Sequence, residues 1–201
     1  MRHLLFFACL LPLCSGAAYA QSACPTVADL PGGIVVVDDQ DATETFYPLT
    51  PGVIRSDYLD TDGTGSRTLL GQGVYLLQYL YLEGGAPQVN TRATTSYPMT
   101  PVDMPVPTPG GAWNTAFASV SETGRVSGEV LAAVFGDLSE LTIGACSYDM
   151  IPVTIDYQSD GYQELIYFLP QLGFGLFVGT RNVGEDFDLT TFLSIKAANE
   201  E

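Results

Sequence analysis

Residues 161–180, GYQELIYFLPQLGFGLFVGT, contain the local pattern that decides the fold. Two runs rich in apolar and aromatic residues, 161–169 and 174–180, flank Pro170 and Gly173. Pro170 ends a strand ladder because it has no N–H to donate, and Gly173 can adopt turn conformations that other residues avoid. The stretch therefore predicts a strand, a tight turn and a second strand.

The same alternation of apolar runs and turn residues recurs about every ten residues, which is typical of an antiparallel all-β domain. One or two short helical turns, for example within 129–135, are the only helices that the pattern allows. We expect an all-β fold: an antiparallel, strongly curved sheet, either a half-barrel or a sandwich, of about a dozen strands. The candidate strands are 34–37, 43–47, 53–59, 67–70, 73–82, 115–120, 125–135, 141–143, 148–157, 161–169, 174–180 and 187–195.

A proline-rich segment between Tyr97 and Trp113 interrupts this pattern. Proline cannot donate to a ladder, so the segment is expected to be a loop rather than a central strand. We interpret 97–113 as a long connection inside a single β-rich domain, 21–201. Its prolines are Pro98, Pro101, Pro105, Pro107 and Pro109.

The first twenty residues have the features of a secretory signal peptide. A short basic start is followed by an apolar stretch, Leu4–Leu13, and by Ala18-Tyr19-Ala20, which supplies small residues for cleavage. Cys14 could instead be the acylated residue of a lipoprotein, although the leucine before it does not suit that processing. No later stretch reaches the roughly 20 apolar residues of a membrane helix. We expect a signal peptide at 1–20 and an exported mature chain, periplasmic or extracellular, with no transmembrane segment.

Cleavage would leave two of the four cysteines, Cys24 and Cys146. In an oxidising compartment this even number makes a disulfide the expected state. A bond across so long a loop stabilises the fold by about 4 to 5 kcal/mol in the chain-entropy model. A redox role is disfavoured because the two thiols are not in a C-x-x-C spacing.

The mature composition excludes several kinds of chemistry. It would contain no histidine, because His3 leaves with the leader, and six basic against 23 acidic residues, a formal net charge of −17. Such a field repels nucleic acid and anionic lipid headgroups, so we expect neither as a partner. Without histidine or a free thiol, no Ser-His-Asp or Cys-His arrangement can form, and no glycine-rich phosphate loop is present. We expect a non-catalytic protein without cofactor or metal.

The later strands carry a resemblance to a group of proteins. Gly144-Ala145-Cys146, Tyr148 and the turn at 167–173 resemble uncharacterised periplasmic or secreted β-rich proteins of proteobacteria. In those proteins an aromatic-x-x-Pro-x-(Leu or Val)-Gly turn lies in the later strands of a curved half-barrel sheet. The resemblance covers residues 140–180. It implies a curved sheet and no catalytic residues.

The candidate strand 73–82 is apolar on both of its faces. Strand alternation places Tyr75, Tyr79 and Tyr81 on one face, which is then either packed in the core or borders a cavity or partner. Tyrosine suits an amphipathic lining because it has an apolar ring and a polar tip. We take these three residues and Trp113 as candidate ligand-facing residues, with core packing as the alternative.

Glu164 is the candidate acid. It lies between Tyr162 and Ile166 on one strand face, and a buried glutamate has a raised pKa and could act as a general acid. The alternative is a structural Glu164 near the solvent-facing start of its strand, hydrogen-bonded or paired with an arginine.

Asp60, Asp62 and Gly65 fit the front half of a calcium-binding loop, in which alternating oxygens surround a hard cation. The twelfth position is Gly71 rather than the expected glutamate, so a hairpin turn is the simpler interpretation. Whether Asp60 and Asp62 bind a cation stays open.

Three functions remain as hypotheses. The first is a non-catalytic exported β-protein that binds a small or lipid-like ligand, or a partner protein, on a concave apolar face. The second is a carboxylate-dependent glycoside hydrolase, in which the separation of two acids decides the mechanism. The third is an outer-membrane β-barrel, which the polar chain end and the unsustained lipid-facing alternation disfavour.

Overall fold

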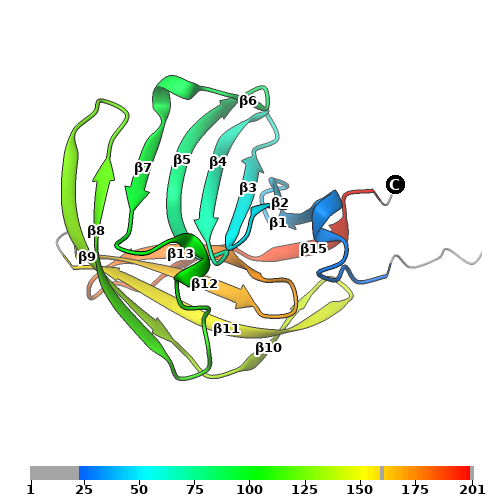
Figure 1. Ribbon diagram of the computed structural model, residues 1–201. Coiled ribbons are helices and arrows are strands. Elements are labelled where there is room, and N and C mark those ends of the chain that lie inside the picture. Colours follow the sequence, from blue (N-terminus) through cyan, green and yellow to red (C-terminus); the bar gives the residue numbers. More distant parts are fainter. Residues whose placement is uncertain (1–22, 159–160, 200–201) are drawn as a thin grey trace, which may run out of the picture.

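The computed structural model describes residues 23–158 and 161–199, and nearly all of their regular structure is β-strand (Figure 1). The strands form one antiparallel sheet, which confirms the all-β prediction. Three short 3-10 turns, η1 (Leu30–Gly32), η2 (Val89–Thr91) and η3 (Pro101–Asp103), complete the structure. The strands are β1 (Ile34–Asp38), β2 (Thr43–Thr50), β3 (Val53–Leu59), β4 (Thr64–Gly71), β5 (Tyr75–Glu83), β6 (Ala86–Pro87), β7 (Ala93–Ser96), β8 (Ala112–Val120), β9 (Val126–Phe135), β10 (Ser139–Ile143), β11 (Cys146–Tyr157), β12 (Tyr162–Leu169), β13 (Phe174–Asn182), β14 (Asp188–Leu189) and β15 (Phe192–Ala197).

The sheet runs in the order β14-β13-β12-β11-β9-β8-β7-β5-β4-β3-β2-β1-β15, with β6 paired to β5. β11 is long enough to pair with β10 along its first part and with β9 along its second. The order therefore follows the chain, apart from the return of β15 to β1.

The two ends of this order, β14 and β15, are consecutive in the chain and are joined by Thr190 and Thr191. The amide of Thr190 donates to the carbonyl of Val178 at 2.7 Å, and the carbonyl of Thr191 accepts from the amide of Asp39 at 2.9 Å. Thr190 and Thr191 are thus hydrogen-bonded to residues near both edges of the sheet.

The sheet bends so that its first and last strands face each other, with β2–β5 above β11–β13 in Figure 1. Phe46 of β2 stacks on Phe174 of β13, with ring centroids 4.0 Å apart. Nearby, the amide of Gly175 donates to the carbonyl of Gly73 at 2.9 Å. A Cβ at position 175 would lie 2.4 Å from Cγ2 of Ile166 on the neighbouring strand β12 and 3.3 Å from the carbonyl oxygen of Gly73, so a side chain here would crowd both contacts.

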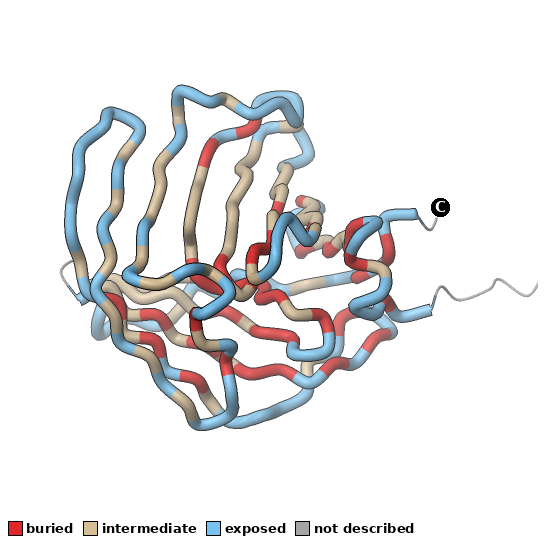
Figure 2. The backbone as a smooth tube through the Cα atoms, in the orientation of Figure 1, coloured by how far each residue is buried: buried red, intermediate tan, exposed pale blue. Residues whose placement is uncertain are grey.

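Two clusters of buried side chains hold the folded sheet together. The first joins β1, β2 and β15 to β10, β11 and β13, and the second joins β5 to β9, β11 and β12. Met104 of the proline-rich connection belongs to the second cluster, so this connection packs on the inside of the curve. Figure 2 shows buried residues concentrated in β11–β13, whereas β4 is half-buried along most of its length. Because residues on both faces of β4 are only half-buried, the face that points into the curve borders open space.

Two sequence predictions need correction. The candidate strand 125–135 is confirmed as β9, and the helical turn that was allowed within 129–135 is not formed because these residues pair with both β8 and β11. The single strand expected at 187–195 is two strands on opposite edges of the sheet, β14 and β15, since Thr190 and Thr191 turn away between them. The short strands β6 and β7 were not expected.

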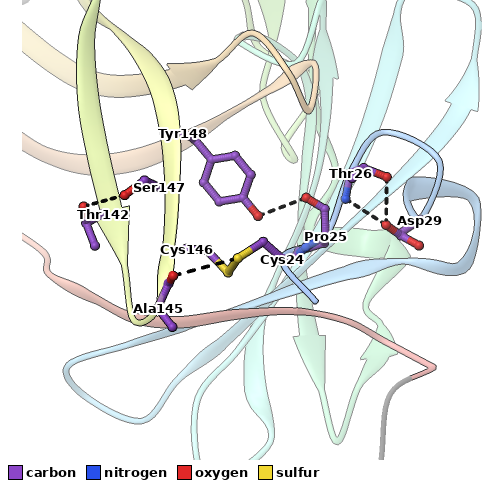
Figure 3. The surroundings of a disulfide bond; sticks show 9 residues. All are labelled: Cys24, Pro25, Thr26, Asp29, Thr142, Ala145, Cys146, Ser147 and Tyr148. Atoms are coloured by element: carbon purple, nitrogen blue, oxygen red, sulfur yellow. Dashed lines mark hydrogen bonds between the residues drawn. A yellow bond between two sulfur atoms is a disulfide. The ribbon is translucent and has the colours of Figure 1, made fainter. Parts of the chain in front are cut away.

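The disulfide prediction is confirmed. Cys24 and Cys146 are bonded, with their Cα atoms 5.5 Å apart and a sequence separation of 122. Figure 3 shows that Tyr148 reinforces this junction, because its hydroxyl donates to the carbonyl of Pro25 at 3.0 Å. The bond fastens the segment before η1 to the start of β11. The signal peptide expected at 1–20 lies outside the described residues.

Candidate ligand cavity

A cavity of about 410 Å³ lies between the two facing parts of the sheet. Strands β1–β5 line one side, and β12, β13 and the segment 190–192 line the other. Most of the lining is apolar, with Leu70, Leu76, Ile166 and Phe177 among the larger side chains. Phe177 is 45% exposed, so the cavity reaches solvent beside this residue.

The inner faces of β3 and β4 explain why the core does not fill this space. Ser56, Ser66 and Thr68 line the cavity at positions where strand alternation would otherwise place core residues. Their small polar side chains cannot reach the opposite strands. Gly73 and Gly175, whose backbones are hydrogen-bonded to each other, form part of the cavity wall and close the cavity at that point.

Glu44 projects into the cavity from β2, between two buried residues of the same strand face, Ala42 and Phe46. Its carboxyl group accepts a hydrogen bond from the hydroxyl of Ser56. The pKa of Glu44 is raised to about 7, chiefly by burial and to a smaller extent by the charge of Asp38, while the hydrogen bond from Ser56 acts in the opposite direction. Glu44 was not among the predicted site residues, although it has apolar neighbours at i−2 and i+2, the same pattern that identified Glu164.

Glu164 lines the same cavity from β12. Its Oε2 accepts a hydrogen bond from the hydroxyl of Tyr157 at 3.1 Å. Burial raises the pKa of Glu164 to about 7, and the Tyr157 hydrogen bond acts in the opposite direction. Within the described residues Glu164 has no ion pair with an arginine, so the arginine-paired alternative does not describe it. Glu44 and Glu164 are both half-buried by surface area, because the cavity leaves part of each carboxyl group beside open space.

Asp38 is the third acid of the lining, and it has a structural role. Its Oδ1 accepts hydrogen bonds from the amides of Gln40 and Ala42, each at 2.9 Å, which fixes the turn between β1 and β2. The cavity lining contains no lysine, arginine or histidine.

The nearest described ion pairs are on the outer face of the sheet. Arg67 contacts Asp57 at 2.6 Å and Arg55 contacts it at 3.5 Å, and none of the three residues lines the cavity. The guanidinium of Arg55 also lies 4.2 Å from the ring centroid of Tyr47. These cations are therefore occupied away from Glu44 and Glu164.

The four aromatic candidates do not lie together. Tyr79 lines the cavity, whereas Tyr75 is fully buried, with its hydroxyl bonded to the carbonyl of Pro105 at 2.9 Å. Trp113 packs on Tyr75 with ring centroids 4.6 Å apart, and Tyr81 is 55% exposed.

A break in strand alternation separates Tyr75 from Tyr79 and Tyr81, whose rings contact each other with centroids 5.2 Å apart. The register of β4 and β5 shifts between Leu69 and Leu70, and the bulge lets Leu76 and Tyr79 share the cavity-facing side. Tyr75 is then placed on the other side, which strict alternation along 73–82 does not predict.

Asp60 and Asp62 lie in the turn between β3 and β4. Oδ1 of Asp62 accepts from the amide and the hydroxyl of Thr64, at 2.9 and 2.7 Å, and Gly63 has a φ of 83°. These contacts are those of a hairpin turn. The described residues contain no group of three or more His, Cys, Asp or Glu arranged to hold a metal ion.

Comparison with known proteins gives little further information. No family model matches the chain, and no curated protein matches it. Among solved structures, the crystal structure of the hypothetical lipoprotein YmcC from Escherichia coli (K12) aligns with a TM-score of 0.43 and 13% identity, covering 83% of this chain and 88% of that chain. In residues 23–158 and 161–199, no helix has the length and hydropathy needed to span a membrane.

Proposed function

We propose that this protein is a non-catalytic, exported β-protein that binds a small ligand with an apolar body in the cavity between β1–β5 and β12–β13. The observation that carries the proposal is the cavity itself: about 410 Å³ with a mostly apolar lining. Ligand sites in proteins are concave, mostly apolar and of roughly 300 to 1,000 Å³. Export is supported by the leader sequence and by the Cys24–Cys146 disulfide, a bond typical of oxidising compartments.

The test uses the mature chain and Nile red, an uncharged dye whose fluorescence rises in apolar surroundings. We expect the dye to bind and to be displaced by a lipid extract. Leu70→Trp should abolish dye binding, because it fills the cavity from β4. Leu69→Trp is the matched control, since this neighbouring side chain does not line the cavity. Equal dye binding by both variants, or no binding by the mature chain, would exclude the cavity as a ligand site.

A second candidate is a carboxylate-dependent glycoside hydrolase. It is favoured by one observation: Glu44 and Glu164 line the same cavity, each with a pKa raised to about 7. A general acid needs a pKa near the working pH. This hypothesis predicts that the mature chain releases reducing sugars from a polysaccharide panel and that Glu164→Gln abolishes the release with no loss of thermal stability. Absence of release across the panel favours the binding function.

A further inference from the structure

The cavity has a charge pattern that binding of an apolar molecule does not explain. Its lining carries the carboxyl groups of Asp38, Glu44 and Glu164 and no basic side chain. Asp38 is engaged by backbone amides, as described above. Within the described residues, Glu44 and Glu164 each accept one side-chain hydrogen bond, from Ser56 and Tyr157. A carboxylate has about four acceptor sites, so most of their capacity is free to serve a ligand.

In residues 23–158 and 161–199, the groups around these two carboxyls supply no compensating charge. The titratable side chains that face them from the neighbouring elements are acids and phenols. These are Asp38 of β1 and Tyr58 of β3 beside Glu44, and Tyr97, Tyr157 of β11 and Tyr162 of β12 beside Glu164. Burying a charge without a partner is unfavourable, and a cation placed beside it removes much of that cost.

We propose, resting on the ligand cavity of the proposed function, that the ligand is an apolar molecule carrying a cationic amine. Its hydrocarbon part would contact Leu70, Leu76 and Ile166, and its ammonium group would lie at one cavity carboxyl group, that of Glu44 or that of Glu164. An anionic head group would meet only negative charge in this lining. A neutral ligand would leave both carboxylates without a counter-charge. The net negative charge of the chain also draws organic cations toward the cavity.

The test compares three amphiphiles with the same hydrocarbon chain: decyltrimethylammonium, decanol and decanoate, each below the concentration at which it forms micelles or separates from water. Displacement of Nile red from the mature chain gives their affinities. Decyltrimethylammonium keeps its charge at every pH, so any pH dependence comes from the protein. We expect it to bind more tightly than decanol at pH 8, with decanoate the weakest. Its affinity should rise about tenfold or more from pH 6 to pH 8, as the cavity carboxyls ionise.

Two pairs of variants assign the effect to residues. Glu44→Gln with Glu164→Gln should remove the preference for the ammonium compound and its pH dependence while decanol still binds. Glu122→Gln with Glu140→Gln makes the same change in net charge at two exposed positions. This control pair should leave the preference for the ammonium compound and its pH dependence unchanged.

The outcomes separate this inference from the function on which it rests. If decanol binds as tightly as decyltrimethylammonium at both pH values, a preference for a cationic head group is excluded and the apolar cavity is retained. If neither the dye nor any amphiphile binds, both proposals fail. A pH-dependent ammonium preference that survives Glu44→Gln with Glu164→Gln also overturns the inference, because the charge would then act from elsewhere.

Discussion

The amide of Gly175 donates a hydrogen bond to the carbonyl of Gly73 at 2.9 Å, so the two parts of the folded sheet meet backbone to backbone. The same two residues form part of the cavity wall. The contact therefore sets how closely β5 and β13 approach and how large the neighbouring cavity is.

We predict that Gly175→Ala lowers the free energy of unfolding by about 1 to 3 kcal/mol, because the new methyl group must displace Ile166. Urea denaturation of the mature chain measures the effect. Gly128→Ala is the matched control, since a Cβ there meets only the carbonyl of Phe117, at an ordinary 3.8 Å. Stability is expected to stay the same or rise slightly in the control. Equal stability of both variants would mean that Ile166 moves aside for the new methyl group without measurable cost.

The stacked rings of Phe46 and Phe174 should be energetically coupled across the fold of the sheet. Each single change to leucine is expected to destabilise the protein. The double variant should lose about 0.5 to 1.5 kcal/mol less than the sum, which is the usual size of an aromatic pair interaction. A double-mutant cycle in urea gives this number directly. Simple additivity would show that the rings contribute through burial alone.

Loss of the Cys24–Cys146 bond should destabilise the domain by about 2 to 5 kcal/mol, since it closes a very long loop. The variant Cys24→Ser with Cys146→Ser is compared with the oxidised parent by thermal unfolding. Adding a reductant should lower the melting temperature of the parent and leave the serine variant unchanged.

Tyr148→Phe tests the same junction with the disulfide intact. The hydrogen bond from its hydroxyl to Pro25 is removed, which is expected to cost about 1 kcal/mol. Urea denaturation under oxidising conditions measures the change. A loss as large as that of the serine variant would indicate that Tyr148→Phe also disturbs the disulfide.

Stability should fall as pH rises from about 4.5 to about 7 and then level off. Burial raises the pKa of Glu44 and of Glu164 from 4.5 to about 7, so in this range the folded chain holds more protons than the unfolded chain. The contribution of these groups is complete below the unfolded pKa and is lost as pH passes through the folded pKa. Glu44→Gln with Glu164→Gln should flatten the curve and exceed the parent in stability at pH 8. Urea denaturation between pH 5 and pH 8 measures this, with Glu122→Gln plus Glu140→Gln as the control.

Most of the sheet was predictable because strand signals are local. The hairpin around Pro170 and Gly173 is visible in a few consecutive residues, and its two strands are β12 and β13. The very short strands β6 and β7 carry too few residues to show alternation. Residues 187–195 gave one continuous β signal. The separation into two edge strands arises because β14 pairs with the preceding strand β13, whereas β15 pairs with β1, which is distant in the chain.

The candidate site was less predictable, because it depends on register and on strands that meet only after the sheet bends. Glu164 was predicted because apolar residues lie two positions before and after it. The same pattern surrounds Glu44 and would have identified it as a second acid of the site. Tyr79 was expected on a shared face with Tyr75, and a one-residue register shift placed them on opposite sides. No local pattern in the sequence reports such a bulge.

Thr190 and Thr191 carry the chain from one edge of the sheet to the other. The first strand, β1, therefore gains its outer partner only when β15, near the end of the chain, has folded against it. Until β15 docks, β1 presents unpaired N–H and C=O groups, and an open edge of this kind invites pairing with other chains. Such distant pairing is also slow to form. A polypeptide delivered to its compartment amino end first would thus pass through an interval in which aggregation competes with completion of the fold, and shielding by a chaperone would matter most in that interval.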